Sequence, residues 1–312
     1  MKKISIVASC YNEELNIEEF YERCLKQIDA FRDRYEFEFI IADNASTDNT
    51  VQKLTEIAEK DKSFKVILNS RNFGQLRSPF YAIQHAYGDA VIVLCSDLQD
   101  PPELIPELIK KWENGNDAVM LQKKSSEENP LIFVLRKLYY AMLSKMSDNG
   151  VELVQNSTGS GLYDKKIVDF IRTVDDTIPF FRGLVCEAGF KRDYVKFSQP
   201  VRKRGKSKNN LYTLYDLGMN GIVKYTRIPL RIMAITGFIM SLLSLLGAFV
   251  YFVWKLLNWN SFSIGIAPII ICILFLGSVQ LFCLGILGEY IGIIYSRVDR
   301  KPIVIEKGRI NF

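Results

Sequence analysis

The sequence predicts a mostly parallel, doubly wound α/β sheet domain followed by two membrane-spanning helices. In residues 1–121, short apolar runs alternate with longer amphipathic segments, which is the pattern of strands joined by crossover helices. The loop after each apolar run is polar and rich in carboxylate and amide side chains. Farther on, the stretches 232–254 and 264–287 contain no charged residue. The first two observations predict the domain, and the third predicts the helices.

The apolar runs predict strands at 4–9, 37–43, 65–69, 90–97 and 117–121. The amphipathic segments predict helices at about 14–30, 48–59, 75–87 and 102–114. In a sheet of this kind, ligands bind at the edge where the carboxyl ends of the strands lie. The loops that follow the strands are therefore the first place to look for a functional site.

The two uncharged stretches are long enough to be membrane spans. A helix over 232–254 would be about 34 Å long, and a hydrocarbon core is about 30 Å thick. Buried core helices are the alternative, but these are usually shorter and more interrupted. The connection carries only Lys255, whereas the outer flanks carry Lys224, Arg227, Arg231, Arg297, Arg300 and Lys301. Both flanks are therefore predicted to be cytoplasmic.

The cysteines and the amino terminus point to the same compartment. The six cysteines show no CxxC spacing, which favours a reduced chain over a disulfide scaffold. The chain begins a strand within four residues and shows no signal-peptide pattern. We therefore expect an integral protein of the cytoplasmic membrane with its domain in the cytoplasm.

Four polar loops follow the first four strands: "CYNEE", "DNASTDNT", "NSRNFGQ" and "SDLQDPP". Their chemistry-bearing side chains are Glu13, Asp43, Asp48, Asn72, Asp97 and Asp100. The loops contain no GxGxxG and no GxxxxGK[ST], so dinucleotide-binding and P-loop proteins have no support. An edge rich in carboxylates suits Mg²⁺ or Mn²⁺, because such a cation can itself carry the phosphates of a ligand.

The fourth loop is where we place this metal. Asp97 and the amide oxygen of Gln99 would point the same way if the strand stayed extended for two more residues. Asp100 precedes two prolines, which is an ordinary way to open a helix, and we predict that structural role for it. Cys95 is expected to pack as a small buried hydrophobe.

These motifs and several later ones resemble the family 2 glycosyltransferases. Within that family they are most similar to the membrane-anchored polyprenyl-phosphate hexosyltransferases, the group of bactoprenol glucosyltransferases and dolichol-phosphate mannose synthases. The matching segments are "YNEE", "DNASTDNT", "RNFGQ", "SDLQDPPELIP", "FRGLV", "RKRGKSK", "GIVKYTRIPLR" and "LGILGEYIG". The resemblance implies a GT-A type domain, a nucleotide diphosphate sugar such as a UDP-hexose, a divalent metal (Mg²⁺ or Mn²⁺) and transfer to a lipid phosphate.

The resemblance also implies roles for individual residues. Asp97 matches the last carboxylate of the DxD motif, which holds the metal and serves catalysis, and Gln99 matches a further metal contact. The implied nucleotide-sugar site comprises Asn12, Glu13, Asp43, Asn72, Gly74 and Asp97. The implied acceptor-phosphate site comprises Arg182, Arg202, Arg204, Ser207 and Lys208, of which three match an "RxxGxSK" signature. Arginine forks suit phosphate oxygens.

Two positions in or beside the four polar loops depart from the family pattern. Cys95 stands where the first acid of the DxD motif is usual, so one of the two acidic positions is lost. Asn44 follows Asp43 at a position where the family commonly has a second aspartate.

A third departure concerns the catalytic base. The segment "STGSGLYDKK" (157–166) replaces the usual "GDFRL", so Gly159 or Ser160 stands where relatives have an aspartate proposed as the base. Glu187, Asp164 and Asp175 are the acids that could substitute in space. A lipid phosphate has a second pKa of about 6 and needs no base to become a nucleophile. The departure therefore favours a phosphate acceptor over a sugar hydroxyl.

A basic segment precedes the first apolar stretch. Residues 191–231 contain eleven Lys and Arg against two Asp, a net charge of +9, whereas the whole chain carries +5. Such a segment attracts anionic lipid headgroups at about 1 kcal/mol per basic residue. Nucleic acid is a poor partner for it, because no recognition motif accompanies the charge. Residues 209–225 are predicted to form an interfacial helix, and 131–146 an interfacial or a core helix.

The predicted organisation is a GT-A domain at 1–208, a juxtamembrane amphipathic segment at 209–231, two transmembrane helices at 232–295 and a cytoplasmic tail at 296–312. The predicted activity is inverting, metal-dependent transfer of a hexosyl unit to a polyprenyl phosphate, such as undecaprenyl phosphate, at the cytoplasmic membrane face. One alternative is a transferase that extends a lipid-linked or polymeric saccharide. Another is a catalytically silent relative that binds nucleotide sugar. The oligomeric state stays open, a homo-oligomer included.

Overall fold

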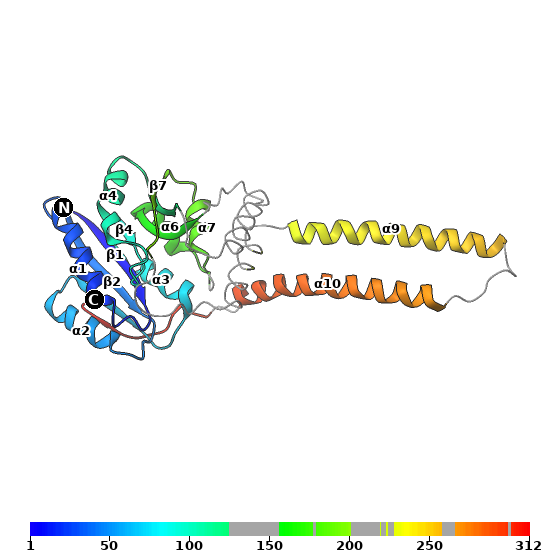
Figure 1. Ribbon diagram of the computed structural model, residues 1–312, viewed down its shortest axis with the longest axis horizontal. Helices are drawn as coiled ribbons and strands as arrows, with labels where there is room; N and C mark the ends of the chain where they lie inside the picture. The colour runs from blue at the N-terminus through cyan, green and yellow to red at the C-terminus, as the bar shows by residue number, and fades with distance from the viewer. Residues whose placement is uncertain are drawn as a thin grey trace.

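The computed structural model describes residues 1–124, 156–176, 179–200, 219, 223, 228–257, 266–298 and 301–312. These residues form an α/β domain from which two long helices extend side by side (Figure 1). Both chain termini lie at the end of the domain farthest from those helices (Figure 1).

A single eight-stranded sheet, in the order β7-β5-β6-β4-β1-β2-β3-β8, organises the described part of the domain. The strands β1 to β4 are parallel to one another, as the sequence predicts, and β5 is parallel to β7. Only β6 and β8 run antiparallel to their neighbours. The strands are β1 (Lys2–Cys10), β2 (Tyr35–Asp43), β3 (Phe64–Asn69), β4 (Ala90–Val93), β5 (Ala118–Lys123), β6 (Ser157–Asp164), β7 (Arg192–Phe197) and β8 (Glu306–Ile310).

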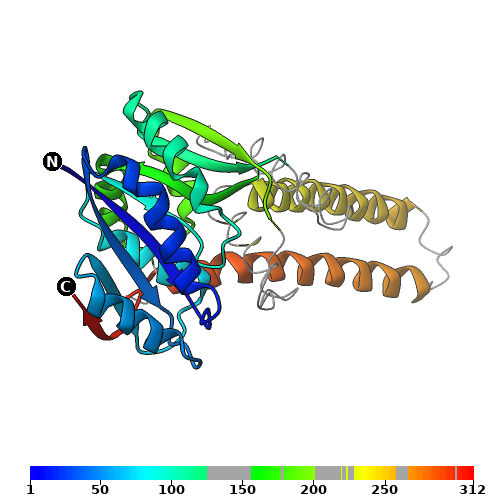
Figure 2. The ribbon, with the colours of Figure 1, turned by 60° about the vertical axis from the view of Figure 1, so that its left-hand side comes forward.

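Helices cover both faces of the sheet, which is why the central strands read as continuous apolar runs (Figure 2). One face carries α1 (Ile17–Ile28), α2 (Thr50–Lys60) and α4 (Ile105–Glu113). The other face carries α3 (Gly74–Gln84), α6 (Lys165–Thr173) and α7 (Phe181–Glu187). In α1 the buried residues are Ile17, Phe20, Cys24 and Ile28, a helical spacing that turns one face to the core.

The strand at 90–97 is shorter than its sequence predicts. β4 ends at Val93, and residues 96–100 form a turn in which Leu98 has φ of +62°. The extended geometry through Gln99, which was the condition for Asp97 and Gln99 to point the same way, is therefore absent. Residues 157–164, which the sequence left without an assigned element, form β6 and insert between β4 and β5.

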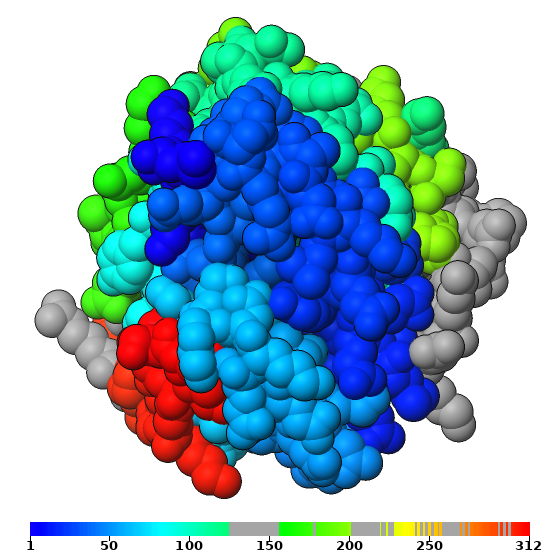
Figure 3. Space-filling model, turned by 90° about the vertical axis from the view of Figure 1, so that its left-hand side faces the viewer, coloured from blue at the N-terminus to red at the C-terminus, as the bar shows by residue number. Residues whose placement is uncertain are grey.

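The carboxyl-terminal residues complete the sheet, which the sequence did not predict. β8 pairs with β3, and Asn311 donates from Nδ2 to the carbonyl oxygens of Ala58 (2.6 Å) and Phe64 (2.9 Å). Figure 3 shows the last residues packed against this part of the surface. β3 is thereby no longer an open sheet edge, and the chain after the apolar helices is tied back to the domain.

The two long helices are α9 (Ile228–Leu257) and α10 (Ile266–Val298). Large apolar side chains are exposed along both, including Phe238 in α9 and Phe282 in α10, each 70% exposed. Within the described residues, the segment Phe275–Gly292 of α10 is long and apolar enough to cross a bilayer, while the apolar segment Ile228–Met240 is shorter. The predicted interfacial helices at 131–146 and 209–225 fall outside the described ranges, apart from two isolated positions.

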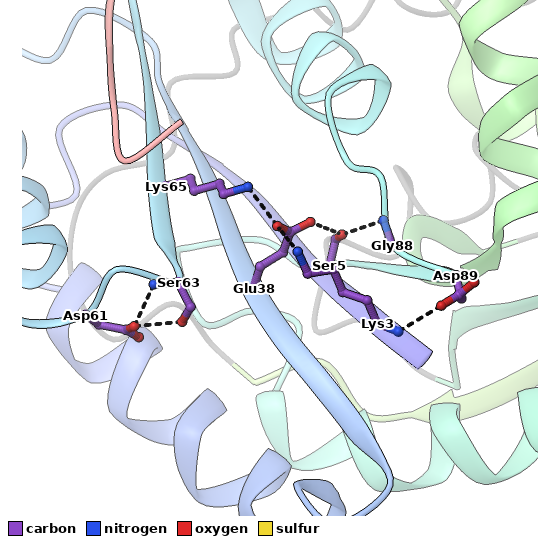
Figure 4. Close-up of polar contacts among 8 residues, drawn as sticks. All are labelled: Lys3, Ser5, Glu38, Asp61, Ser63, Lys65, Gly88 and Asp89. Carbon is purple, nitrogen blue, oxygen red and sulfur yellow. Dashed lines mark hydrogen bonds and ion pairs between the residues drawn. The ribbon is translucent and has the colours of Figure 1, made fainter. Parts of the chain in front are cut away.

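A buried carboxylate holds together the amino-terminal ends of three strands (Figure 4). Glu38 is 3% exposed and accepts hydrogen bonds from Ser5 Oγ (2.7 Å), Lys3 Nζ (3.1 Å) and Lys65 Nζ (2.9 Å). Ser5 Oγ also accepts from the backbone N–H of Gly88. Burial by itself would raise the pKa of the Glu38 carboxyl, but the bonds from Ser5 and the two lysines outweigh it and lower that pKa. This network lies at the strand ends opposite the polar loops, so it serves stability.

Candidate active site at the carboxyl edge of the sheet

The loops after β1 and β2 are joined through Asn12. This residue has φ of +56°, its backbone N–H donates to Ser46 Oγ (2.9 Å), and its Oδ1 accepts from Thr47 N (2.8 Å). Glu13 is buried beside it, donates its backbone N–H to Thr50 Oγ1 (2.9 Å) and accepts from Asn16 at the start of α1. The structure thus brings two of the predicted nucleotide-sugar residues together with the loop that carries Asp43.

Asp43 is the last residue of β2 and is 1% exposed. Its Oδ2 accepts from the backbone N–H of Ser46 (3.1 Å), and Cys10 Sγ lies 3.8 Å from its Oδ1. Burial raises the pKa of the Asp43 carboxyl, although the bonds from Ser46 and Cys10 oppose the shift. A buried carboxylate at a strand end can accept a hydrogen bond from a ligand N–H or O–H.

The loop after β3 is hydrogen-bonded to the loop after β2 through Asn44. Its Nδ2 donates to Asn72 Oδ1 (2.9 Å), and its Oδ1 accepts from Phe73 N (2.9 Å). Gly74, at the start of α3 with φ of +84°, donates its N–H to Asn72 Oδ1 (2.8 Å). Five predicted nucleotide-sugar residues therefore lie on three interlinked loops: Asn12, Glu13, Asp43, Asn72 and Gly74.

The turn after β4 holds Asp97 and Gln99, the predicted metal ligands. Asp97 is half-buried, and its Oδ1 accepts from the backbone N–H of Gln99 (3.1 Å), so the side chain closes a tight turn. Ser96 Oγ donates to the backbone oxygen of Ser9 in β1 (3.0 Å), which fixes the turn beside the first loop.

Asp100 has a different role from the predicted helix opening. The helical turn that follows begins at Pro102, and no side chain caps it. Asp100 is instead 1% exposed, and its Oδ2 accepts from Ser160 Oγ of β6 (2.5 Å), while its Oδ1 has no partner among the described residues. Burial raises the pKa of Asp100, and the charge of Asp97 adds to the shift. The carboxyl thus fixes the turn that carries Asp97 and Gln99 to β6 beside it.

Cys95 is exposed, so the prediction that it packs as a buried hydrophobe is wrong. Its Sγ lies 3.9 Å from Ser160 Oγ, near the carboxyls of Asp100 and Asp97.

Arg182 is the one predicted acceptor residue inside the described ranges. It is half-buried on α7 and lies against Gly159, which has φ of +84°. A Cβ atom added at Gly159 would come within 3.2 Å of Arg182 Cγ and 3.3 Å of its Nε. The Arg182 guanidinium therefore lies beside the position at which the family resemblance implies a catalytic base. The other acceptor candidates, Arg202, Arg204, Ser207 and Lys208, lie outside the described residues.

Among the acids proposed to replace the base, Asp164 is remote from the site. It caps α6 by accepting from Lys166 N, and it accepts from Trp112 Nε1 at the far end of β6. The described residues contain no cluster of three or more His, Cys, Asp or Glu that could hold a metal. Asp97 and Gln99 still fit Mg²⁺ or Mn²⁺, because these cations often take one or two protein oxygens and fill their shell with water and substrate phosphates.

Sequence reasoning named three positions that shape this edge but missed what they do: Asn44 links two loops, and Asp100 pairs with Ser160. Asn44 had a signal, because an amide stands there in place of the family's aspartate. The pairing of Asp100 with Ser160 had none, because the two residues are 60 positions apart and β6 carries no diagnostic motif.

The sheet and its polar loops define an α/β protein with a candidate ligand site at the carboxyl ends of its parallel strands, and the comparisons identify the family. The chain belongs to the family "Glycosyl transferase family 2", whose sequence pattern matches residues 5–172. It is 33% identical over 304 residues to an uncharacterized glycosyltransferase, sll0501, of Synechocystis sp., covering 97% of this chain and 94% of that protein. It is also 33% identical over 311 residues to the SfII prophage-derived bactoprenol glucosyl transferase of Shigella flexneri, covering 98% and 97%.

A solved structure supports the fold. Glucosyl-3-phosphoglycerate synthase from Mycobacterium tuberculosis, crystallised with Mn²⁺, UDP and phosphoglyceric acid, matches with a TM-score of 0.50 and 19% identity, covering 71% of this chain and 76% of that one. The predicted family and the mostly parallel GT-A type sheet are confirmed.

Proposed function

We propose that the protein transfers a hexosyl unit, with inversion, from a nucleotide diphosphate sugar to a polyprenyl phosphate at the cytoplasmic face of the membrane. A UDP-hexose is the proposed donor and undecaprenyl phosphate the proposed acceptor. Bactoprenol glucosyl transferases of similar sequence over nearly the full chain support a lipid acceptor.

The observation that carries the proposal is the position of the site relative to α10. β8 runs antiparallel to β3, so Glu306 pairs with Asn69 at the carboxyl end of β3, and Ser70 N donates to Ile305 O (2.9 Å). α10 ends at Val298, seven residues before Ile305. Seven residues span at most about 25 Å. The edge that carries the polar loops is therefore held close to the end of an apolar helix.

This arrangement suits a reaction between a soluble donor and a lipid acceptor. With α9 and α10 in the bilayer, the short connection from α10 keeps the carboxyl edge at the membrane surface. A lipid phosphate at that surface would then meet a nucleotide sugar that enters from the cytoplasm. The proposed division into domain, juxtamembrane segment (209–231), transmembrane pair (232–295) and tail (296–312) follows from this arrangement, with β8 of the tail anchored in the sheet.

The donor would lie across the linked loops, with the Asp43 carboxyl accepting from its base or ribose and Asn12, Glu13, Asn72 and Gly74 lining the same place. Asp97 and Gln99 would hold the divalent cation. When bound, this cation neutralises the diphosphate that leaves. The chain's own part is to hold Asp97 in its turn through the bond from Gln99 N (3.1 Å).

The chemical step is a single displacement. A lipid phosphate oxygen attacks the anomeric carbon, the bond from that carbon to the diphosphate breaks, and the electron pair leaves with the nucleoside diphosphate. Because the phosphate is already ionised, no residue has to remove a proton. Arg182 beside Gly159 would stabilise this anionic acceptor, where a carboxylate would repel it.

The test is transfer by the purified full-length protein in detergent. It would be given a panel of nucleotide sugars, undecaprenyl phosphate and Mg²⁺, and products would be identified by mass. We expect one hexosyl-phosphoryl-lipid product, and we expect EDTA to prevent its formation. A product that forms only on a saccharide acceptor would support the elongating alternative. Donor binding without turnover on any acceptor would support the silent relative.

Residues Arg202, Arg204, Ser207 and Lys208 remain proposed ligands of the acceptor phosphate. If Arg202 binds the phosphate, Arg202→Ala should slow transfer by roughly tenfold to a hundredfold and leave nucleotide binding intact. Lys196 lies in the same basic segment and serves as the control. In detergent, where bilayer charge is absent, Lys196→Ala should keep the wild-type rate. Equal effects of the two substitutions would indicate a general membrane-surface patch.

A further inference from the structure

The carboxamide of Asn44 is buried between the loops that follow β2 and β3. Asn44 is 4% exposed, and all of its polar atoms are used. Its Oδ1 accepts from Phe73 N (2.9 Å) and Asn69 Nδ2 (3.1 Å), and its Nδ2 donates to Asn72 Oδ1 (2.9 Å) and Gly74 O (3.3 Å). Few surface-loop amides are satisfied so completely, so the orientation of this one is strongly determined.

Backbone donors fix which way both amides point. The N–H of Phe73 requires an acceptor, so Asn44 must turn its oxygen to it. The N–H of Gly74 likewise requires that Asn72 present its oxygen (2.8 Å). A backbone N–H cannot become an acceptor, so neither amide can be flipped without breaking a bond. The Nδ2 of Asn44 then meets the Oδ1 of Asn72 as donor to acceptor.

One consequence concerns what Asn72 can offer to a ligand. Its Oδ1 already accepts two hydrogen bonds, from Asn44 Nδ2 and Gly74 N. A carbonyl-type oxygen has two lone pairs, so this acceptor is saturated. Asn72 is exposed, and its Nδ2 makes no hydrogen bond to the residues that the structure describes. Toward a ligand at the edge, Asn72 is therefore a donor only.

We propose that Asn72 donates from Nδ2 to an acceptor oxygen of the bound nucleotide sugar, and that Asn44 is the positioning residue that holds Asn72 in this polarity. The inference rests on the proposed function. The acceptor oxygen is a carbonyl of the base or an oxygen of the diphosphate, and the same donor serves either. The site then presents a donor at Asn72 beside the buried acceptor Asp43, the residue before Asn44.

The same geometry explains why position 44 is an amide in this chain. An aspartate there could still accept from Phe73 N and Asn69 Nδ2. Its second oxygen, however, would stand about 2.9 Å from the oxygen of Asn72, acceptor against acceptor. The amide avoids this conflict.

The test measures binding of UDP by the full-length protein in detergent with Mg²⁺, using calorimetry. Asn72→Asp keeps the acceptor for Gly74 N and Asn44 Nδ2 but removes the donor. Asn72→Ser removes the amide donor without adding charge. Its hydroxyl lies one bond closer to the backbone than Nδ2, so it does not reach the same ligand oxygen, but it can still accept from Gly74 N. Each should weaken UDP binding by about tenfold or more. The control is Asn49→Asp, an equal charge change at an exposed position of a neighbouring loop, which should change the Kd by less than about twofold.

Uridine, which lacks phosphate, identifies the oxygen. Its binding can be followed by ligand-observed NMR in the wild type and in Asn72→Ser. If the loss persists with uridine, Asn72 contacts the nucleoside. If uridine binds both proteins equally while UDP does not, the oxygen belongs to the diphosphate. Either pattern agrees with the proposal.

Asn44→Asp tests the positioning role. The KM for the donor should rise by about tenfold with a smaller change in kcat, and the double variant Asn44→Asp/Asn72→Ser should bind UDP no more weakly than the worse single variant, since both act on one contact. A purely structural role would lower the melting temperature and leave the Kd of the folded protein unchanged. Wild-type UDP affinity in both Asn72 variants would overturn the inference. Failure of the wild type to bind UDP would instead overturn the proposed donor.

Discussion

Replacing Gly161 by alanine should strongly destabilise the domain. Gly161 lies in β6 with φ of +153°, and a Cβ atom there would be 2.3 Å from the backbone oxygen of Val119 and 2.9 Å from the Cα of Met120. Both contacts are with the backbone of β5, so relief requires that two paired strands move apart. Overpacking of this kind costs about 1–3 kcal/mol, and the unusual φ adds a further 1–2 kcal/mol or so. The expected loss is therefore about 2–5 kcal/mol.

Two other glycines separate the clash from the backbone strain. Gly115 has φ of +82° and Gly308 has no left-handed φ, and a Cβ atom at either would meet nothing within 4 Å. Gly115→Ala should therefore cost about 1 kcal/mol and Gly308→Ala almost nothing.

The assay is thermal unfolding of the three variants in one detergent. For a domain of this size, 1 kcal/mol shifts the melting temperature by about 2–4 °C, so Gly161→Ala should melt roughly 4–20 °C below the wild type. Gly308→Ala should have the highest melting temperature of the three variants, Gly115→Ala an intermediate one and Gly161→Ala the lowest. Equal melting temperatures of Gly161→Ala and Gly308→Ala would refute the reasoning that β6 packs too closely against β5 to accept a Cβ atom at position 161.

Three further predictions concern the site, the buried network and the carboxyl terminus. Asp97→Asn should abolish transfer while leaving the melting temperature unchanged, because it removes a carboxylate expected to hold the metal; wild-type turnover in this variant or in EDTA would exclude that role. Glu38→Gln should lower the free energy of unfolding by about 1–3 kcal/mol at pH 7. The pKa of Glu38 is lowered in the folded state, so this carboxylate stabilises the fold above its unfolded pKa, and the difference between wild type and variant should shrink as the pH falls below about 4.5 in denaturation curves. Asn311→Ala should cost about 1–2 kcal/mol and increase hydrogen exchange in β3, because the carbonyls of Ala58 and Phe64 lose their donor; unchanged exchange would show that β8 is held by its strand pairing alone.

The local pattern was sufficient to predict the elements that precede residue 124. Strands β1, β2, β3 and β5 and the helices between them lie within a few residues of their predicted positions, because burial on two faces makes each strand a mostly apolar run. The prediction failed at the end of β4, where the apolar pattern continues but the backbone turns. Leu94 continues the apolar run of β4, yet the strand has already ended at Val93, and the backbone turns at Leu98 to bring Asp97 against the N–H of Gln99.

The sequence predicted which residues lie together at the carboxyl edge of the sheet, but not the bonds that link them. The carboxyl ends of parallel strands lie at one edge of a sheet. Asn12, Asp43 and Asn72 could therefore be grouped from the sequence alone. Motif matching also located Asp97 and Gln99. It could not show that Asp100 is buried against Ser160, nor that Cys95 is exposed, since both depend on where the antiparallel β6 inserts.

The sequence by itself determined the family, the parallel direction of the first strands and the apolar character of the two long helices, since periodicity, motifs and composition are local properties. Only the tertiary structure decided which loops are hydrogen-bonded to one another and where the carboxyl-terminal residues pack. The contact of Asn44 with Asn72 joins residues 28 positions apart, and that of Asn311 with Ala58 joins residues 253 apart. Such pairings depend on strand order and register, which arise from packing the whole sheet, so no short stretch of sequence encodes them.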